Sequence, residues 1–120
     1  MNKRILEKAI QEAKKSEHNQ RVGAVIFDKN KIVSCGHNYP QKSVRSITKK
    51  FINWPNSVHG EIDALIKART DVKGMSILVV RINKSGLLRL AKPCEMCYSY
   101  LCFVGIKKIF YSTEEEIRCL

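Results

Sequence analysis

Hydrophobic residues in the first third of the chain follow first a helical and then a strand spacing. Five of them fall on one face of a helix, with Lys and Glu opposite: Ile5, Leu6, Ala9, Ile10 and Ala13. This amphipathic pattern predicts a first helix that ends near Ser16. The continuous apolar run at residues 22–27 predicts a buried strand. A polar turn at 28–31 and a second apolar stretch at 32–35 indicate that this strand belongs to a hairpin.

The middle of the chain combines a long irregular stretch with a second helical pattern. Residues 36–56 contain two of the prolines and no clear periodicity, and a loop of that length in a compact domain is usually functional or disordered. A second helix is predicted from Ser57 or Val58 to about Arg69, because Ile62, Leu65 and Ile66 form an apolar stripe.

The last third has the order strand, helix, strand. Residues 76–82 form an apolar run typical of a strand, and 83–92 form a turn-rich connection. Pro93 is favoured at the first position of a helix and Gly105 just after the last, so a third helix is predicted between them. A final strand is predicted at 107–112. This order is typical of a parallel crossover, which indicates an α/β layered domain with a mixed sheet.

Length and charge limit the classes of protein that the chain can represent. Its 120 residues fit a single domain, 1–120, and a domain this small gains stability from a bound metal or from a homo-oligomer interface. The N-terminal segment is polar and no apolar run is long enough to span a bilayer, so we expect a cytoplasmic protein without a membrane partner. The net charge of +11 favours an anionic partner, either a nucleotide or a nucleic acid, over a merely well-solvated surface.

The five cysteines suggest metal chemistry rather than disulfides. An odd number of cysteines in a chain without a secretion signal argues against a disulfide framework. Cys94 and Cys97 form a C-x-x-C pair, which suits metal or redox chemistry. Cys35 and Cys102 lie in apolar stretches and are expected to be buried, and Cys119 is expected to be an exposed thiol.

Two short motifs at predicted helix starts contain the residue types of a catalytic zinc site. His59 and Glu61 begin one helix, and Cys94 and Cys97 begin another. Zinc prefers thiolate and imidazole ligands, and a catalytic site uses three protein ligands and keeps the fourth position for water. His59, Cys94 and Cys97 are therefore the expected Zn²⁺ ligands. Glu61 is close enough in sequence to take a proton from the bound water without replacing it.

Each of these residues alone has a simpler explanation. A C-x-x-C pair could be a redox pair, His59 could cap its helix or lie in the core, and Glu61 could only complement a helix dipole. Their combination at two helix starts separated by a strand favours the catalytic interpretation.

The sequence resembles the cytidine/deoxycytidylate deaminase superfamily over nearly all of its length. The motifs H-x-E at 59–61 and P-C-x-x-C at 93–97 match the signature of zinc nucleobase deaminases. Residues 21–26 are similar to the family's first strand, and Gly36 and Asn38 to its Gly-x-Asn. The segment with Gly105, Ile106 and Tyr111 is more similar to the deoxycytidylate deaminase-like branch, although parts of both motifs are also similar to tRNA adenosine and guanine deaminases.

The resemblance implies a fold and a set of roles. The fold would be α/β, a three-layer α-β-α cytidine-deaminase-like arrangement with a mixed five-stranded sheet whose last strands are parallel. His59, Cys94 and Cys97 would bind zinc, and Glu61 would be the catalytic proton shuttle. Asn38 would hydrogen-bond the sugar or base, and the N–H of Gly60 would face a base carbonyl.

The loop at 36–56 carries the residues expected to contact the rest of the substrate. Arg45 is one of its basic residues and could hold a phosphate, while Trp54 could stack on a base, which is worth about 1–3 kcal/mol. The alternative is that the aromatic residues Phe51 and Trp54 only pin the loop to the domain. Arg81, Lys84 and Arg89 could add positive potential near the zinc.

Three functions follow from these observations. The first, which we favour because the chain has little beyond a catalytic core, is deamination of the cytosine base of a free nucleotide such as dCMP to the uracil product and ammonia. The second is editing of cytosine or adenine in single-stranded DNA or RNA, or deamination of a free purine. The third is a zinc-stabilised binding module without activity, in which Glu61 would have no role.

Overall fold

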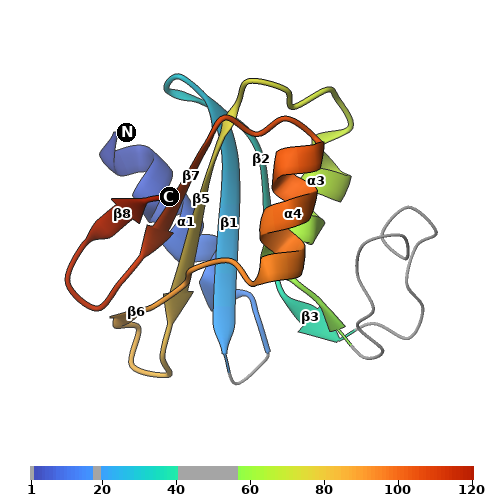
Figure 1. The fold of residues 1–120 in the computed structure, drawn as a ribbon. Coiled ribbons are helices and arrows are strands. Elements are labelled where there is room, and N and C mark those ends of the chain that lie inside the picture. Colours follow the sequence, from blue (N-terminus) through green and yellow to red (C-terminus); the bar gives the residue numbers. More distant parts are fainter. Residues whose placement is uncertain (1, 18–19, 41–56) are drawn as a thin grey trace.

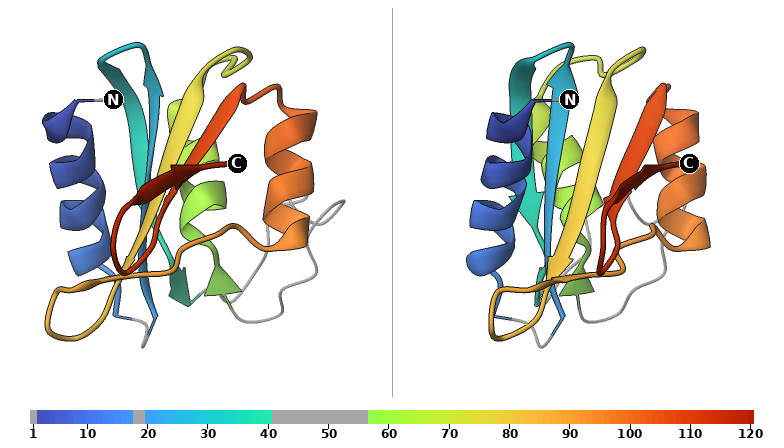
Figure 2. Two further views of the ribbon diagram at one scale, coloured as in Figure 1. Left: turned by 60° about the vertical axis from the view of Figure 1, so that its left-hand side comes forward. Right: turned by 90° about the vertical axis from the view of Figure 1, so that its left-hand side faces the viewer.

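A mixed β-sheet with helices on both faces forms the centre of the protein (Figures 1 and 2). The computed structural model describes residues 2–17, 20–40 and 57–120. Within these residues the sheet has six strands in the order β2-β1-β5-β7-β8, with β6 paired to β5. Their bounds are β1 Arg21–Asp28, β2 Lys31–His37, β5 Ser76–Ile82, β6 Leu88–Arg89, β7 Lys108–Ser112 and β8 Ile117–Cys119. A separate two-stranded ribbon pairs β3 (Tyr39–Pro40) with β4 (Ser57–Val58).

The three described helices divide between the two faces of the sheet. Helix α1 (Lys3–Lys14) covers one face, and helices α3 (Gly60–Ala68) and α4 (Glu95–Phe103) cover the other, as Figure 2 shows. This arrangement confirms the predicted three-layer α/β fold. No helix in the described ranges is long and apolar enough to cross a membrane.

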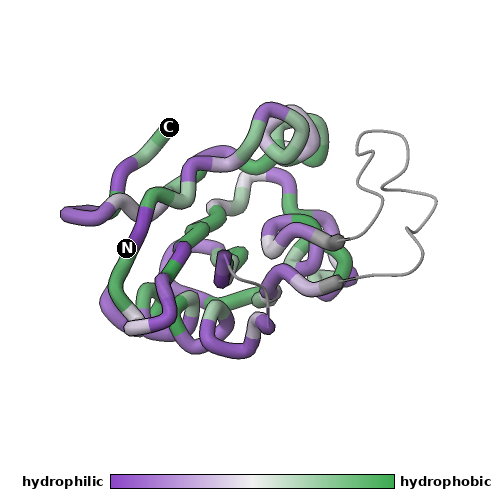
Figure 3. Tube along the Cα trace, turned by 90° about the horizontal axis from the view of Figure 1, so that it is seen from below, coloured by the Kyte–Doolittle hydropathy of each residue, from purple (hydrophilic) through white to green (hydrophobic). Residues whose placement is uncertain are grey.

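The two faces of the sheet explain why the central strands are apolar without interruption. Successive side chains of a strand point to opposite faces. In β1, Ala24 and Ile26 enter the core under α3 and α4, whereas Val25 and Phe27 enter the core under α1. β5 behaves in the same way, because Ile77 and Val79 belong to the first core and Leu78, Val80 and Ile82 to the second. Hydrophobic and hydrophilic segments alternate along the chain trace (Figure 3).

Helix α1 lies where the periodicity predicts it. The Asn2 side chain accepts a hydrogen bond from the N–H of Ile5 at 3.1 Å and so caps the helix start. Ile5, Ala9 and Ala13 are fully buried against β1 and β5.

The predicted boundaries of the other two helices need a small correction. Helix α3 begins at Gly60 rather than at Ser57 or Val58, because those two residues pair with β3 and His59 adopts the extended backbone of an N-cap. Helix α4 begins at Glu95 with Cys94 as its N-cap. Gly105 follows its end with φ of 89°, and the N–H of Ile106 bonds to the carbonyl of Leu101, which confirms the predicted glycine cap.

The sheet is mixed, as predicted. β1 pairs antiparallel with both β2 and β5, whereas β5 and β7 are parallel through the α4 crossover. The short strands β6 and β8, both antiparallel to their neighbours, were not evident in the apolar pattern. One side chain expected inside lies outside: Cys102 is exposed, and the neighbouring Phe103 is 69% exposed. They occupy the outer side of α4, whose inner side buries Cys97, Tyr100 and Leu101. Cys119 is exposed, as predicted.

Gly36 allows α3 to approach β2. A Cβ at this position would lie 2.3 Å from the backbone nitrogen of Ala64, a distance that requires the helix to move. We expect Gly36→Ala to lower the free energy of unfolding by about 1–3 kcal/mol, the usual cost of an overpacked core. Urea unfolding measures this. Lys31→Ala, at the exposed start of the same strand, is the control, and equal stability of the two variants would contradict the close approach.

Candidate zinc centre

Three side chains from two helices converge at one edge of the sheet. Nδ1 of His59 lies 3.4 Å from Sγ of Cys97 and 4.0 Å from Sγ of Cys94. One ligand atom from each residue lies within 4.8 Å of the other two. The structure therefore brings together the three residues that were predicted as metal ligands.

The packing of α3 against α4 accounts for this convergence. Ile62 of α3 and Tyr100 of α4 share a small buried cluster with Cys97. His59 and Cys94 are the N-cap residues of the two helices, and both have extended backbone. The His59 side chain makes no capping hydrogen bond, so the structure does not support the simpler interpretation of His59 as a cap.

The donor set fits Zn²⁺. Zinc binds Cys sulfur at about 2.3 Å and His nitrogen at about 2.0 Å in a tetrahedron, which places a nitrogen and a sulfur about 3.5 Å apart. The two observed nitrogen–sulfur separations, 3.4 and 4.0 Å, lie on either side of this value. Zn²⁺, two thiolates and a neutral imidazole also sum to no net charge, which lowers the cost of burying the centre.

The thiols of Cys94 and Cys97 form a hydrogen bond with each other, and this contact shifts their pKa values in opposite directions. Hydrogen bonding with the Cys97 side chain, and with the backbone N–H groups of Cys97 and Met96, lowers the pKa of Cys94 to about 6. Burial of Cys94 opposes these effects. The same contact with Cys94, together with burial, raises the pKa of Cys97. One of the two sulfurs is thus a ready thiolate, and the other loses its proton when a metal ion takes that proton's place.

Glu61 lies beside this cluster and is buried, with 5% of its surface exposed. Burial raises the pKa of Glu61 to about 7, and the negative charge of Cys94 adds to the rise, while hydrogen bonding with Cys97 opposes it. A carboxylate with such a pKa can both accept and donate a proton near neutrality.

A pocket of about 270 Å³ opens next to the cluster. Its lining includes two of the predicted ligands, His59 and Cys94, and also Glu61. Two predicted substrate-binding residues, Asn38 and Gly60, line it as well. The other two, Arg45 and Trp54, lie outside the described residues. A larger hollow of about 450 Å³ beside α3 and α4 contains none of these side chains.

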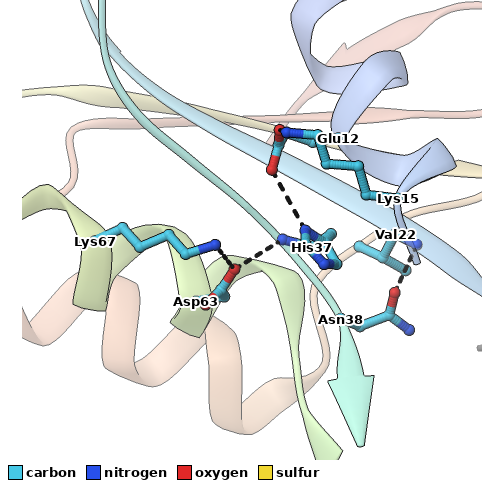
Figure 4. Close-up of polar contacts among 7 residues, drawn as sticks. All are labelled: Glu12, Lys15, Val22, His37, Asn38, Asp63 and Lys67. Carbon is cyan, nitrogen blue, oxygen red and sulfur yellow. Dashed lines mark hydrogen bonds and ion pairs between the residues drawn. The ribbon is translucent and has the colours of Figure 1, made fainter. Parts of the chain in front are cut away.

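Asn38 joins the ends of β1 and β2 at the pocket wall. Its Oδ1 accepts a hydrogen bond from the N–H of Val22 at 3.0 Å, and its Nδ2 donates to the carbonyl of Gln20 at 2.6 Å. Figure 4 shows the contact with Val22. The amide group is thus held in place at the end of the sheet, with one of its two N–H groups used in the bond to Gln20.

A polar network around two buried carboxylates, Glu12 and Asp63, connects α1, β2 and α3 behind Asn38 (Figure 4). The N–H of His37 donates to Oδ2 of Asp63 at 3.1 Å, and Lys67 pairs with the same oxygen at 2.8 Å. Nδ1 of His37 lies 3.4 Å from Oε1 of Glu12, whose other oxygen pairs with Lys15 at 2.6 Å. The pairing fixes the end of β2, and therefore the position of Asn38, against both helices.

Sequence reasoning did not identify several residues of the pocket wall. They are Gln20, Val22, Val79, Leu90, Ala91 and Lys92, together with Arg81, which was expected only to add positive potential. Lys92 directly precedes the P-C-x-x-C motif, and Arg81 lies two residues after Val79, on the same face of the strand. Both positions could therefore have been predicted from the sequence to lie near the zinc site.

Comparison with known families agrees with this geometry. Residues 1–113 match the family described as the cytidine and deoxycytidylate deaminase zinc-binding region. The chain therefore belongs to this family. The match also supports Zn²⁺ as the metal of the His59, Cys94 and Cys97 cluster.

Individual relatives are more distant. The chain is 29% identical over 99 residues to an uncharacterized deaminase from the luxG 3′ region of Aliivibrio fischeri, and this match spans 80% of the chain but only 60% of that protein. A cytidine deaminase from Burkholderia pseudomallei has a similar fold, with a TM-score of 0.70, 19% identity and coverage of 100% of this chain and 92% of that one. The dCMP deaminase of the cyanophage S-TIM5 in its apo form gives a TM-score of 0.61 at 20% identity, covering 94% and 86% of the two chains.

We expect the purified protein to contain one zinc ion per chain and to lose it in the Cys97→Ser variant, because the site then lacks a thiolate. Metal analysis of the purified variants measures this, and thermal unfolding with and without a chelator shows the stabilisation that the metal gives. Cys102→Ser, an exposed cysteine on the same helix, is the control. Full zinc content in Cys97→Ser would contradict the ligand assignment.

The contacts of Glu12 with Lys15 and His37 should make the stability of the protein depend on pH. Burial alone would raise the pKa of Glu12, but contacts with Lys15 and His37 lower it below its ordinary value of 4.5. A carboxylate whose pKa is lower in the folded state stabilises the fold above its unfolded pKa, and this contribution is lost as the pH falls through the folded value. Glu12→Gln should therefore be less stable than wild type at pH 7, with a difference that shrinks toward about pH 3.

Urea unfolding of both proteins at the two pH values measures this difference. Glu7→Gln, which replaces an exposed carboxylate on the same helix, controls for the loss of charge. A Glu12→Gln deficit that stays constant with pH would show that the packing of the side chain, and not its charge, is responsible.

Proposed function

We propose that this protein catalyses the zinc-dependent hydrolytic deamination of a cytosine base in a free nucleotide such as dCMP, releasing ammonia and the uracil product. The observation that carries the proposal is the placement of Glu61 beside the His59, Cys94 and Cys97 cluster, in a pocket that those residues help to line. A zinc site with a purely structural role has four protein ligands, whereas the described residues supply three and a carboxylate next to them.

Proton transfer is the role of Glu61 in this proposal. Zinc, when bound, supplies a water molecule whose pKa is low enough for it to lose a proton near neutrality. Glu61 would take that proton and deliver it to the ring nitrogen of the base, and would then pass the second proton, from the newly added hydroxyl group, to the amine that departs as ammonia when the C–N bond breaks. Its burial keeps the carboxylate away from bulk water and close to the reacting atoms.

The pocket wall supplies groups that can hold a planar base. Val22 and Val79 offer apolar surface on the side of the sheet. Gly60 is the first residue of α3, where backbone N–H groups have no partner within the helix, so its N–H is suited to a base carbonyl. The anchored amide of Asn38 is suited to a sugar hydroxyl or to the base.

A free nucleotide is the substrate class that we favour. A pocket of about 270 Å³ lies just below the usual range of ligand pockets, roughly 300–1,000 Å³, and so suits one nucleotide unit rather than a longer strand. The fold is also similar to that of the cyanophage S-TIM5 dCMP deaminase, whose structure was solved in complex with dCMP and dUMP. The net charge of +11 favours the second candidate, a deaminase that acts on single-stranded nucleic acid.

We expect Glu61→Gln to lower kcat by roughly 100- to 10,000-fold while the protein stays folded and keeps its zinc, because the variant loses the group that moves the proton. Ammonia release and metal content are the measurements. Glu95→Gln, an exposed carboxylate in the first turn of α4, should keep wild-type activity. An active Glu61→Gln protein would favour a binding module over an enzyme.

The substrate class can be tested with a panel of compounds. We expect ammonia release from dCMP or a related cytosine nucleotide, with weak dependence on salt, because a single phosphate contact releases few counterions. The panel contains cytidine, deoxycytidine, their monophosphates, adenosine, guanine and single-stranded oligonucleotides. Activity confined to oligonucleotides and falling steeply between 50 and about 200 mM salt would replace the nucleotide proposal with the editing one.

A further inference from the structure

Arg81 places a buried, unpartnered donor in the pocket wall. The alternation along β5 puts Arg81 on the same side of the sheet as Val79, the side that α3 and α4 cover, and both residues line the zinc-side pocket. Nε of Arg81 is buried, and the structure gives it no hydrogen-bond acceptor among the described residues. A buried donor without a partner costs free energy, so its retention calls for an acceptor that is supplied from elsewhere.

A hydrogen bond to Ser112 fixes the backbone of β5 at Arg81, so the position of this residue in the pocket wall is well defined. The N–H of Arg81 donates to Oγ of Ser112 at 3.1 Å, and that hydroxyl donates to the carbonyl of Arg89 at 2.7 Å. Ser112 is fully buried, and its carbonyl accepts a hydrogen bond from Ala91 at 2.9 Å. The β5–β6 hairpin, which carries Arg81 and leads to the zinc-ligand helix, is thus clamped to β7.

Within the described part of the chain, Arg89 of the hairpin has an ion-pair partner and Arg81 has none. Arg81 and Arg89 are direct cross-strand partners, and Arg89 forms an ion pair with Glu114 at 2.9 Å. Lys92, at the far end of the hairpin, is exposed and lines the same pocket. Among the described residues that line the pocket, the cationic side chains are Arg81 and Lys92 and the carboxylate is Glu61, which the proposed function already uses.

We propose that Arg81 and Lys92 form an anion subsite that binds the phosphate of the substrate, so that this pocket selects phosphorylated substrates over nucleosides. The inference rests on the proposed function and names the residues that set its substrate class. A guanidinium presents N–H groups in a planar fork that matches phosphate oxygens, and an ammonium adds a point charge. The phosphate oxygens supply the acceptor that Nε of Arg81 lacks within the described chain.

The phosphate could belong to a mononucleotide or to a nucleic-acid backbone, and we assign it to the mononucleotide because the pocket has room for one nucleotide unit. The two sources differ in charge: a terminal phosphate monoester carries more negative charge at neutral pH than a backbone diester. Two cations therefore match the monoester better.

Binding measurements on the zinc-loaded protein test the subsite without relying on turnover. We expect dUMP to bind at least tenfold more tightly than deoxyuridine, and inorganic phosphate to compete with dUMP. Arg81→Gln should weaken dUMP binding about 10- to 100-fold, the usual effect of losing a charged hydrogen bond, and leave deoxyuridine binding unchanged. Arg81→Lys should restore part of the loss, because it keeps the charge.

Two further variants provide an independent test of the subsite and a control for the loss of charge. Lys92→Gln removes an exposed side chain and should weaken dUMP binding even if Arg81→Gln fails to fold. Lys84→Gln, which removes one positive charge from the exposed turn of the same hairpin, should bind dUMP like wild type. Equal dUMP binding by wild type, Arg81→Gln and Lys92→Gln would overturn the subsite, and so would equal loss in Lys84→Gln, which would indicate only a general field.

Kinetics separate the subsite from the proposed function. For dCMP, Arg81→Gln should lower kcat/KM about 10- to 100-fold mainly through KM, with no change for deoxycytidine. If cytosine nucleotides are deaminated but Arg81→Gln treats dCMP and deoxycytidine like wild type, the subsite is wrong and the function stands. If no cytosine compound is deaminated while monophosphate binding still requires Arg81, the function is wrong and the subsite stands. Dependence on Arg81 for oligonucleotides alone would overturn the monoester assignment.

Discussion

Direct packing between α3 and α4 is the contact on which the site depends. The two helices begin at the same edge of the sheet and meet through Ile62, Cys97 and Tyr100, so that their N-cap residues come within ligand distance of each other. Gly36 adds a second condition, because α3 can lie this close to the sheet only where β2 has no side chain. The ligand geometry is therefore a consequence of helix placement and not of a flexible loop. A metal ion bound there would in turn hold the two helix starts together.

The carboxyl groups of Glu12 and Glu61 have pKa values that are shifted in opposite directions by their surroundings. Glu12 and Glu61 are both buried, yet the pKa of Glu12 is lowered and that of Glu61 is raised to about 7. Burial raises both, but Glu12 has Lys15 and His37 as partners, whereas Glu61 has a thiolate nearby. The first remains charged and ties α1 to the end of β2. The second remains ready to exchange a proton at the place where the two zinc-binding helices meet.

The sequence predicts the zinc cluster and the layered fold well, because both depend on local signals. H-x-E and P-C-x-x-C fix the ligand types, and the apolar periods fix α1, β1, β5 and β7. The structure was needed for features that depend on pairing between distant segments. Ser57 and Val58 extend into β4 because they meet β3, and Phe103 is exposed because α4 already has a buried side. That Nε of Arg81 has no acceptor among the described residues also depends on which groups distant segments bring near it, and no pattern in β5 itself reveals that.

The β5–β6 hairpin lies between a core strand and the helix that carries both cysteines, yet its hydrogen bonds to Ser112 anchor it independently of the cluster. Asn83 closes its turn by accepting from the N–H groups of Ser85 and Leu87. The hairpin can therefore be lengthened, shortened or recharged during evolution while the metal ligands keep their places. With the proposed anion subsite, chemistry and selectivity lie on separate parts of the chain, so a lineage that carries this fold can acquire new substrates without rebuilding its reactive centre.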